Sequence, residues 1–379
     1  MRKALFHGGV LAAAAAVSLT LGACSPPSST PSSSSSGGVN AATATSAAEF
    51  GGLDSLVTAA KKEGQLNVIA LPPDWANYGA IIKAFQDKYG ITVNSAQPDA
   101  SSQDEINAAN QLKGQSKAPD VFDLGTSVAL ANTAMFAPYK VATWSDIPDA
   151  LKEASGTWVN DYGGYMSIGY DASKVPAPTT VKDLLGSGYK GKVALNGDPT
   201  QAGAAFNGVV MASLGNGGSA DNIAPGVDFF SQLKKAGNFL PVDPTPATIE
   251  SGQTPVVIDW DYLNVAQGVK LKGKMDWKTV VPDNAVVGSY YIQAISKDAP
   301  HPAAARLWEE FLYSDQGQNL WLAGGARPVR ADAMVKAGTI DQAAFAALPK
   351  VTGTPVFLTQ DQIKTASDYL AANWAKAIG

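Results

Sequence analysis

The apolar and polar positions after residue 51 form short apolar runs that alternate with longer amphipathic stretches. An apolar run at 66–71 is typical of a buried strand, and the next segment, 77–89, places Ile81 and Phe85 at helical spacing. A second strand is predicted at 91–94. This order of elements predicts a βαβ unit.

The same alternation continues to the end of the chain. Thr359 followed by Gln362 has the sequence of a capping box, which predicts the start of a last helix. Strands that alternate with helices imply mostly parallel sheets covered on both faces, so we expect an α/β fold. The pattern predicts further strands at 119–124, 192–196 and 255–258, and helices at 104–114, 202–214, 227–236 and from 302.

A basic and then apolar segment opens the chain. Arg2 and Lys3 precede an apolar core, 10–21, which at about a dozen residues is too short to span a membrane and is typical of a secretory signal over 1–23. Its end, Leu21 to Cys24, resembles the lipobox of bacterial lipoproteins. The resemblance implies that Cys24 is lipidated and holds the protein on the extracytoplasmic face of the cell membrane, at the cell surface or in the periplasm.

Residues 24–50 follow as a segment of low complexity. From Ser25 to Ala48 the chain has no charged residue and consists almost only of Ser, Pro, Ala, Thr and Gly. Such a composition cannot bury a core. We expect a flexible tether between the lipid and the folded part.

Charge and cysteine content narrow the function classes. Without Arg2 and Lys3 the chain carries 26 basic and 33 acidic residues, which argues against nucleic acid or an anionic membrane as the main partner. Cys24 is the one cysteine of the chain, so no disulfide or thiolate metal site can form within it. No motif indicates a cofactor or a resident metal.

Five sequence strings, taken in order, resemble the extracellular solute-binding proteins of ABC importers, most of all the group with ferric-iron-binding and polyamine-binding receptors. The resemblance implies a monomeric receptor that hands a small solute to a membrane permease. The strings are AAKKEGQLNVIAL (59–71), APDVFDLGTS (118–127), YKGKVALNGDPT (189–200), ISKDAPHPAAARLWEEFLYSDQGQ (295–318) and GGARPVR (324–330).

The resemblance also implies a periplasmic-binding-protein type 2 fold with two lobes and two crossover segments. The segments 165–171 and 288–295 resemble the outgoing and returning crossovers. Lobe 1 would then combine 51–165 with 292–379, and lobe 2 would take 166–291. Receptors of this kind close around the ligand by a hinge motion, which the permease recognises.

In open α/β sheets the ligand lies beyond the carboxyl ends of the strands, which here places it among the loops 72–78, 125–127, 197–201 and 259–262. These loops and the returning crossover supply the candidate ligand contacts. They are Trp75, Thr126, Ser127, Asp198, Thr200, Gln201, Asp259, Asp261, Tyr262, Tyr290 and Tyr291.

The last of these loops alternates acids with aromatics. In an extended chain Asp259 and Asp261 share one face while Trp260 and Tyr262 share the other, so two carboxylates could converge on one cation. Asp261 could equally cap the following helix.

Two other loops indicate a negatively charged ligand instead of a cation. Asp198 before Pro199 has the sequence of a helix cap followed by the first helical residue, and Thr126 and Ser127 carry the same ambiguity. Free N–H groups and hydroxyls at such helix starts favour an anion. The sequence leaves the sign of the ligand's charge open.

The aromatic residues point to a polyamine-like cation, such as spermidine or putrescine, as the first hypothesis. Trp75 could stack on a ligand or enter the core, and the first-strand loop of the polyamine-binding relatives carries aromatics as Trp75 does here. Tyr290 and Tyr291 depart from the pattern of these relatives, which carry a Trp and an Asp in the returning crossover. Tyr262 matches one position of the ferric-binding relatives, so ferric iron is the alternative. His301, the one histidine left after the signal, is expected at the surface.

A secreted enzyme is the alternative from another class. A glycoside hydrolase needs only two carboxylates, which Asp198 and Asp261 could supply. No GxSxG turn is present, and a catalytic triad would have to use His301. We therefore expect a binding protein without catalytic activity.

Overall fold

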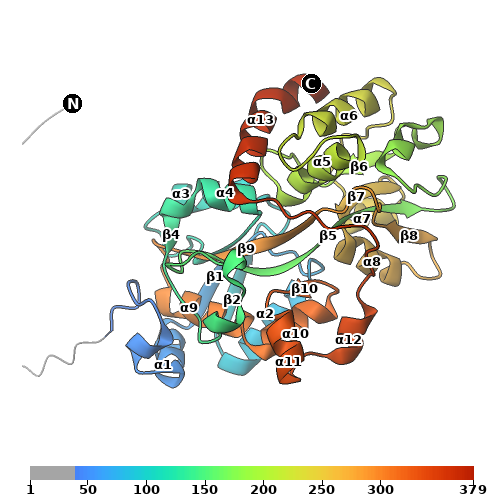
Figure 1. The fold of residues 1–379 in the computed structure, drawn as a ribbon. Coiled ribbons are helices and arrows are strands. Elements are labelled where there is room, and N and C mark those ends of the chain that lie inside the picture. The colour runs from blue at the N-terminus through green and yellow to red at the C-terminus, as the bar shows by residue number, and fades with distance from the viewer. Residues whose placement is uncertain (1–38) are drawn as a thin grey trace, which may run out of the picture. The chain divides into compact units, whose positions relative to one another are not determined.

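Two long strands connect two groups of strands (Figure 1): β5 (Val159–Asp171) and β9 (Gly288–Ser296). The first half of β5 pairs antiparallel with β9, and its second half pairs antiparallel with β7 (Val256–Trp260) and β8 (Trp277–Val280). We call the part around β1–β4 lobe 1 and the part around β6–β8 lobe 2.

The computed structural model describes residues 39–379, which form one compact unit containing both lobes. The predicted signal sequence, the predicted lipidation site Cys24 and most of the predicted tether lie outside the described residues. Within 39–379, no helix has the length and apolarity needed to cross a membrane.

Lobe 1 begins with the predicted βαβ unit, which is confirmed. Parallel pairing of β1 with β2 places Leu66 opposite Val93, and the helix between them buries Ile81 and Phe85. The strands are β1 (Gln65–Ile69), β2 (Thr92–Ala96), β3 (Val121–Leu124), β4 (Phe136–Ala137) and β10 (Arg327–Pro328). The helices are η1 (Ala47–Phe50), α1 (Leu53–Glu63), α2 (Tyr78–Tyr89), α3 (Ser102–Gln111), α4 (Thr126–Ala131), η2 (Thr133–Met135), η3 (Trp144–Asp146), η4 (Asp149–Leu151), α9 (Pro302–Leu312), α10 (Asp315–Ala323), α11 (Ala331–Ala337) and α12 (Gln342–Ala347).

Lobe 2 repeats the pattern on a smaller sheet. Parallel pairing of β6 (Val193–Leu195) with β7 places Leu195 opposite Ile258. One helix of this lobe, α5, is buried almost along its whole length because it is apolar on all sides. The helices are η5 (Val181–Leu185), η6 (Ser187–Tyr189), α5 (Gly203–Gly215), α6 (Ala224–Lys235), α7 (Pro246–Glu250) and α8 (Asp261–Lys270).

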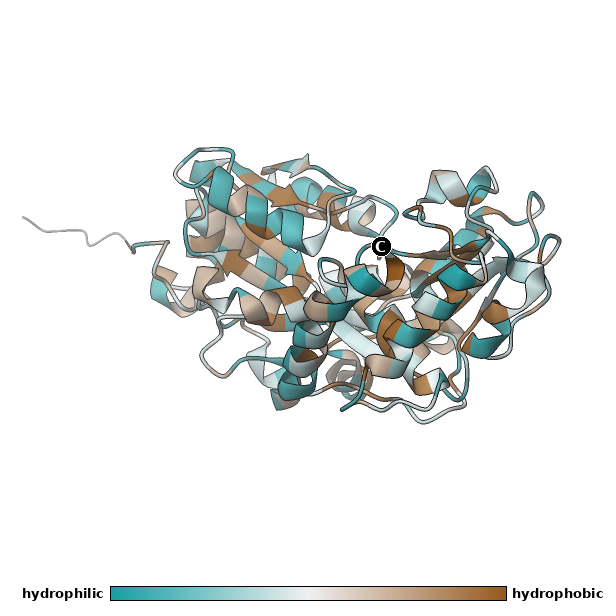
Figure 2. Cartoon of the chain, turned by 90° about the horizontal axis from the view of Figure 1, so that it is seen from above, coloured by the Kyte–Doolittle hydropathy of each residue, from teal (hydrophilic) through white to brown (hydrophobic). Residues whose placement is uncertain are grey.

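The predicted α/β fold with two lobes and two crossover segments is confirmed, but its sheets are more mixed than the alternation predicted. The crossover strands run antiparallel to β3, β4, β7, β8 and β10, and parallel pairing is found for β1 with β2 and for β6 with β7. Figure 2 shows apolar residues gathered in the strands and hydrophilic ones on the outer helices.

Two segments differ from the expected boundaries. Residues 39–50, assigned to the tether, are attached to lobe 1, where Arg306 donates hydrogen bonds to the carbonyls of Ala42 and Ala44 at 3.0 and 2.7 Å. The last helix, α13 (Gln360–Ile378), starts at the predicted capping box but packs on α6 of lobe 2 through Trp374 (Figure 1).

Candidate functional site

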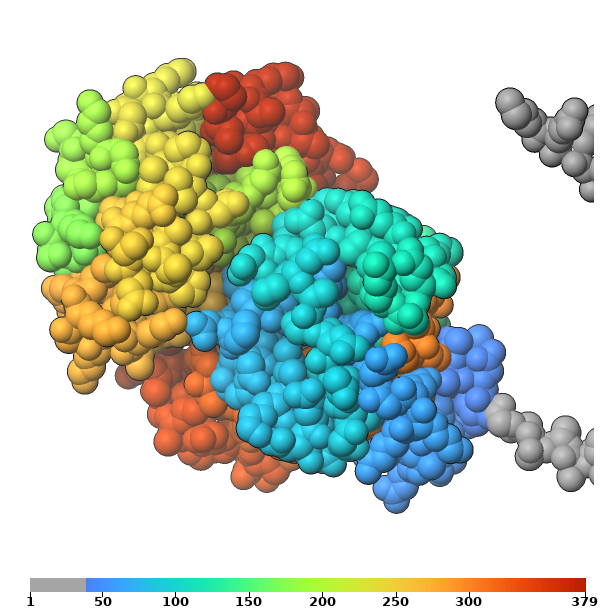
Figure 3. Space-filling view, turned by 180° about the vertical axis from the view of Figure 1, so that it is seen from behind, coloured from blue at the N-terminus to red at the C-terminus, as the bar shows by residue number. Residues whose placement is uncertain are grey.

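A cavity of about 650 Å³ lies between the two lobes. Its walls come from the segments that follow β1 and β2 and from Asp123 of β3 in lobe 1, from the segments that follow β6 and β7 and the segment around α7 in lobe 2, and from Tyr291 of β9. In Figure 3 the blue and cyan segments of lobe 1 meet the yellow and orange segments of lobe 2, which line this cavity. The cavity therefore lies at the carboxyl ends of the strands, as open α/β sheets favour.

The cavity wall is strongly acidic. Among residues 39–379, Lys270 is the one basic residue of the lining, and its Nζ already pairs with Asp74 at 2.9 Å across the two lobes. The acidic residues of the lining are eight: Asp74, Asp99, Asp104, Glu105, Asp123, Asp198, Asp243 and Asp259. So many carboxyl groups facing one cavity attract cations and repel anions.

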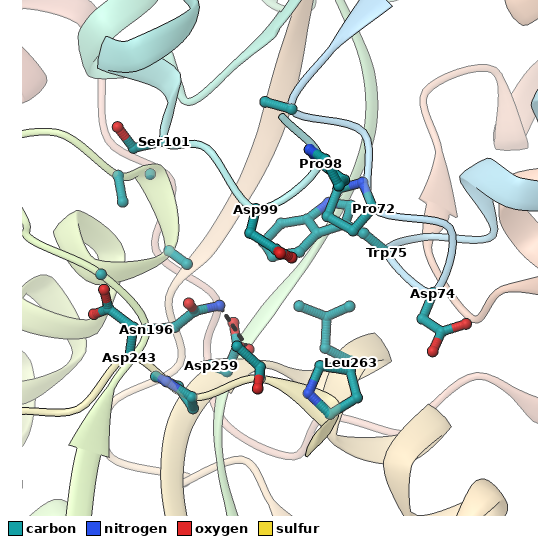
Figure 4. A pocket seen from close by; sticks show the side chains of 18 of the residues that line it. Pro72, Asp74, Trp75, Pro98, Asp99, Ser101, Asn196, Asp243, Asp259 and Leu263 are labelled. Carbon is teal, nitrogen blue, oxygen red and sulfur yellow. Dashed lines mark hydrogen bonds between the residues drawn. The ribbon is translucent and has the colours of Figure 1, made fainter. Parts of the chain in front are cut away.

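Asp259 stands at the end of β7 and is 7% exposed. Its Oδ1 accepts a hydrogen bond from the Trp260 N–H at 2.8 Å, and its Oδ2 accepts one from Asn196 Nδ2 at 2.9 Å, drawn as a dashed line in Figure 4. Burial raises the pKa of Asp259 to about 7. This carboxyl group therefore changes charge near neutral pH.

Asp123, at the end of β3, is the corresponding carboxyl group of lobe 1 and was missed by the sequence reasoning. It is 6% exposed, and its Oδ2 accepts a hydrogen bond from the Tyr162 hydroxyl at 2.9 Å, while its Oδ1 finds no partner among residues 39–379. Burial raises its pKa as well. The signal was present, because Asp123 interrupts the apolar run Val121–Leu124.

A third acid supports this corner of the cavity. Glu105, on α3, is 1% exposed, and its Oε2 accepts a hydrogen bond from the Asp123 N–H at 3.1 Å. Burial raises the pKa of Glu105 well above its usual value, and the neighbouring Asp123 charge raises it further. Two buried acids thus lie side by side, and neither forms an ion pair with another of residues 39–379.

Trp75 and Tyr291 provide the aromatic part of the lining. The Trp75 indole donates a hydrogen bond to the Tyr162 hydroxyl at 2.8 Å and meets the Tyr291 ring edge to face, with centroids 5.7 Å apart. The Tyr291 hydroxyl accepts a hydrogen bond from Trp260 Nε1 at 3.3 Å. Figure 4 shows the indole on the same wall as Asp99. Aromatic faces beside carboxylates suit an organic cation.

The predicted convergence of Asp259 and Asp261 is wrong. The strand ends at Trp260, so Asp261 starts α8 and the alternation of faces stops there. Asp261 is fully buried, pairs with Arg327 Nη1 at 2.7 Å and accepts hydrogen bonds from the N–H groups of Tyr165 and Tyr262. Because Asp261 does not line the cavity, it cannot act with Asp198 as a glycosidase pair there.

The three candidate tyrosines differ in whether they line the cavity. Tyr262 stacks on Trp260, with centroids 6.2 Å apart, and both rings lie in the core and do not line the cavity. Tyr290 stacks on Phe357, with centroids 6.2 Å apart, and does not line the cavity. Neighbouring residues of a strand point to opposite faces, so Tyr291 alone of its pair faces the cavity.

The family comparison agrees with this architecture. Residues 118–350, more than half of the chain, match the model of the bacterial extracellular solute-binding proteins. The chain belongs to this family. No curated protein sequence matches the chain at a significant level.

Several solved structures share the fold of this solute-binding protein at low sequence identity. Iron-bound HitA from Pseudomonas aeruginosa is 21% identical with a TM-score of 0.59, over 83% of this chain and 99% of HitA. AgtB from A. tumefaciens R10 in complex with agropinic acid is 15% identical with a TM-score of 0.65, over 83% and 98%. AfuA from Actinobacillus pleuropneumoniae with fructose-6-phosphate is 15% identical with a TM-score of 0.59, over 83% and 96%.

Thr126 and Ser127 lie in the first turn of α4 and do not line the cavity of this solute-binding protein. Thr126 Oγ1 donates a hydrogen bond to the Tyr290 carbonyl at 3.0 Å. A Cβ on Gly125 would lie 2.6 Å from the Gly203 Cα, so the two lobes touch backbone to backbone at this point. Ligand contacts from Thr126 and Ser127 stay a prediction that this cavity does not support.

The loop after β6 contributes only in part. Asp198 Oδ1 accepts hydrogen bonds from the N–H and hydroxyl of Thr200 at 2.7 and 2.5 Å, which closes a turn. The helix starts later, at Gly203, so Asp198 does not cap it as predicted. Asp198 and Gln201 line the cavity from exposed positions, whereas Thr200 does not.

His301 is buried rather than at the surface. It is 7% exposed, its Nδ1 lies 2.9 Å from Asp120 Oδ2, and its Nε2 lies 2.8 Å from Gln65 Nε2. The hydrogen bond with Asp120 raises the pKa of the imidazole. Within residues 39–379, no group of three or more His, Cys, Asp or Glu side chains is placed to hold a metal ion.

Proposed function

We propose that this protein is the receptor of an ABC importer for a small organic cation of the polyamine type, which it delivers to the membrane permease. One observation carries the proposal: eight acidic side chains line the cavity, and the one basic residue there, Lys270, is already paired. Charged amino groups of a ligand would neutralise these carboxylates as the cleft closes.

The aromatic lining supports the same ligand class. Trp75 and Tyr291 offer ring surfaces beside Asp123 and Asp259, so the alkyl segments of an amine could pack while its ammonium groups meet carboxylates. An acidic solute such as a sugar phosphate would find no unpaired basic side chain in this lining.

Ferric iron is the second candidate, and HitA, one of the neighbours in fold, is iron-bound. Carboxylate oxygens and the Tyr291 hydroxyl are hard oxygen donors that suit this ion. Iron would require the two lobes to bring at least three such donors together on closing.

The proposed function also implies where the protein is located in the cell and how it closes. Lipidation of Cys24 would keep the receptor on the extracytoplasmic face of the membrane, next to its permease. We propose hinges near residues 165 and 292, where the crossover strands β5 and β9 pass between the lobes, and a receptor that works as a monomer.

A thermal-shift panel tests the function. The full chain would be heated with spermidine, putrescine, ferric citrate, fructose 6-phosphate or glutamate, because a ligand at 100 times its Kd adds about 2.7 kcal/mol of stability. We expect the polyamines to raise the Tm, and Asp259→Asn to remove most of the shift. A shift with ferric citrate alone supports the iron receptor, and a shift with only the acidic solutes contradicts both candidates.

A further inference from the structure

Asp123 and Asp259 are the two acids of the cavity wall that are more than nine-tenths buried and stand at strand ends, one in each lobe. Neither takes part in any ion pair formed by residues 39–379. Burying a carboxyl group without a cation costs free energy. Two such carboxyl groups facing one cavity indicate a site that binds the positive charge of a ligand.

The hydrogen bonds leave each acid room for a ligand. At Asp123, the Tyr162 hydroxyl occupies Oδ2, and Oδ1 has no partner among the described residues. At Asp259, each oxygen accepts a single hydrogen bond, from Trp260 and from Asn196, although a carboxylate oxygen can accept two. Both carboxyl groups are thus held in place and still able to accept a bond from an ammonium group.

Side-chain contacts connect Tyr291 with the surroundings of both acids. The ring stacks on Tyr162, with centroids 5.5 Å apart, and the Tyr162 hydroxyl donates the hydrogen bond to Asp123 Oδ2. The Tyr291 hydroxyl accepts a hydrogen bond from Trp260, the residue that follows Asp259, at 3.3 Å. Tyr291 belongs to β9, the crossover strand, and its ring lines the cavity. Tyr291 thus contacts both Tyr162, the hydrogen-bond partner of the lobe 1 acid, and Trp260, the neighbour of the lobe 2 acid.

We propose that Asp123 and Asp259 bind the two ends of an aliphatic diammonium ligand whose carbon chain crosses the Tyr291 ring, so that each lobe holds one ammonium group. This inference rests on the proposed function and assigns its substrate class. A ligand with two charges would join the lobes and favour the closed cleft, whereas a monoamine would bind one lobe only.

The test compares a diamine with its matched monoamine by isothermal titration calorimetry on the full chain. Putrescine and butylamine share a four-carbon chain and differ in one ammonium group. We expect putrescine to bind at least about 100-fold more tightly, since each buried charge pair contributes that much or more. Equal affinities would overturn the proposal without any variant having to fold.

Variants then locate the two ends. Asp123→Asn and Asp259→Asn should each lower putrescine affinity about 100-fold, to the level of butylamine on the wild type. Asp228→Asn, at an exposed acid of α6 outside the lining, should change it less than threefold.

The outcomes separate this inference from the proposed function. Tight putrescine binding that Asp123→Asn leaves unchanged overturns the two-ended site but keeps the cation receptor. Failure of every amine to bind overturns both.

Discussion

Asp259 provides a prediction about stability that needs no ligand. Its pKa rises from the usual 3.8 to about 7 because the folded protein buries the carboxyl group. The neutral form fits the fold and the charged form does not, so the folded state loses stability as the pH rises from 3.8 to about 7. Asp259→Asn keeps the shape and removes the charge, so the variant escapes this loss.

The magnitude follows from the pKa values. The difference between 3.8 and about 7 corresponds to about 4 kcal/mol above pH 7. Between pH 5 and pH 8, the wild type should lose about 3 kcal/mol relative to the variant at this one residue. Both hydrogen bonds can persist in the variant, because Asn196 can turn its amide to accept from Asn at position 259.

Urea unfolding of both proteins, followed by tryptophan fluorescence at pH 5 and pH 8, measures this difference. The informative quantity is the difference in unfolding free energy between the variant and the wild type, and how much this difference changes from pH 5 to pH 8. A packing effect of the substitution that is the same at both pH values cancels from this change. Asp243→Asn, which removes an exposed acid of the same cavity, is the matched control variant. A pH-independent difference for Asp259→Asn would refute the inference that this carboxyl group is buried without compensation.

Further predictions concern binding, the buried ion pair and the membrane anchor. Putrescine affinity should rise between pH 6 and pH 8, because only the ionised carboxyl group of Asp259 attracts an ammonium group. The rise should reach about tenfold per pH unit below the pKa of Asp259. Calorimetry in a pH series would measure it, and an affinity that does not change with pH would contradict it. Arg327→Met should cost about 3–5 kcal/mol in urea unfolding because it leaves Asp261 buried without its partner, whereas Lys274→Met at an exposed pair should cost less than about 1 kcal/mol. Cys24→Ser should release the receptor from the membrane fraction with unchanged ligand affinity; a variant that stays with the membrane would refute the lipid anchor.

Much of the fold could be predicted from the periodicity of apolar residues. The strand at 66–71, the helix at 77–89 and the capping box at Thr359 all occur close to where the pattern placed them. These features are local, because strand and helix spacing and helix capping depend on residues close in sequence. The position of α13 on lobe 2 was not predictable in this way, because it depends on a contact between Trp374 and Phe230.

The candidate site was predicted in outline only. The rule about strand ends pointed to Trp75 and Asp259, and both line the cavity. It could not tell that Thr126 bonds to the Tyr290 carbonyl, or that Tyr290 turns toward Phe357. Such partners are distant in sequence, and only their positions in the folded chain decide which side chains remain for a ligand.

The sequence by itself determined the alternation of strands and helices, the α/β class and the acidic balance of the chain, because these depend on composition and short-range spacing. The tertiary structure decided which acids face the cavity. Arg327, 66 residues away in sequence, takes Asp261 out of the site, while Asp123, within an apolar run, enters it. A carboxyl group is free for a ligand only if no distant residue neutralises it, and that is settled when the lobes pack together.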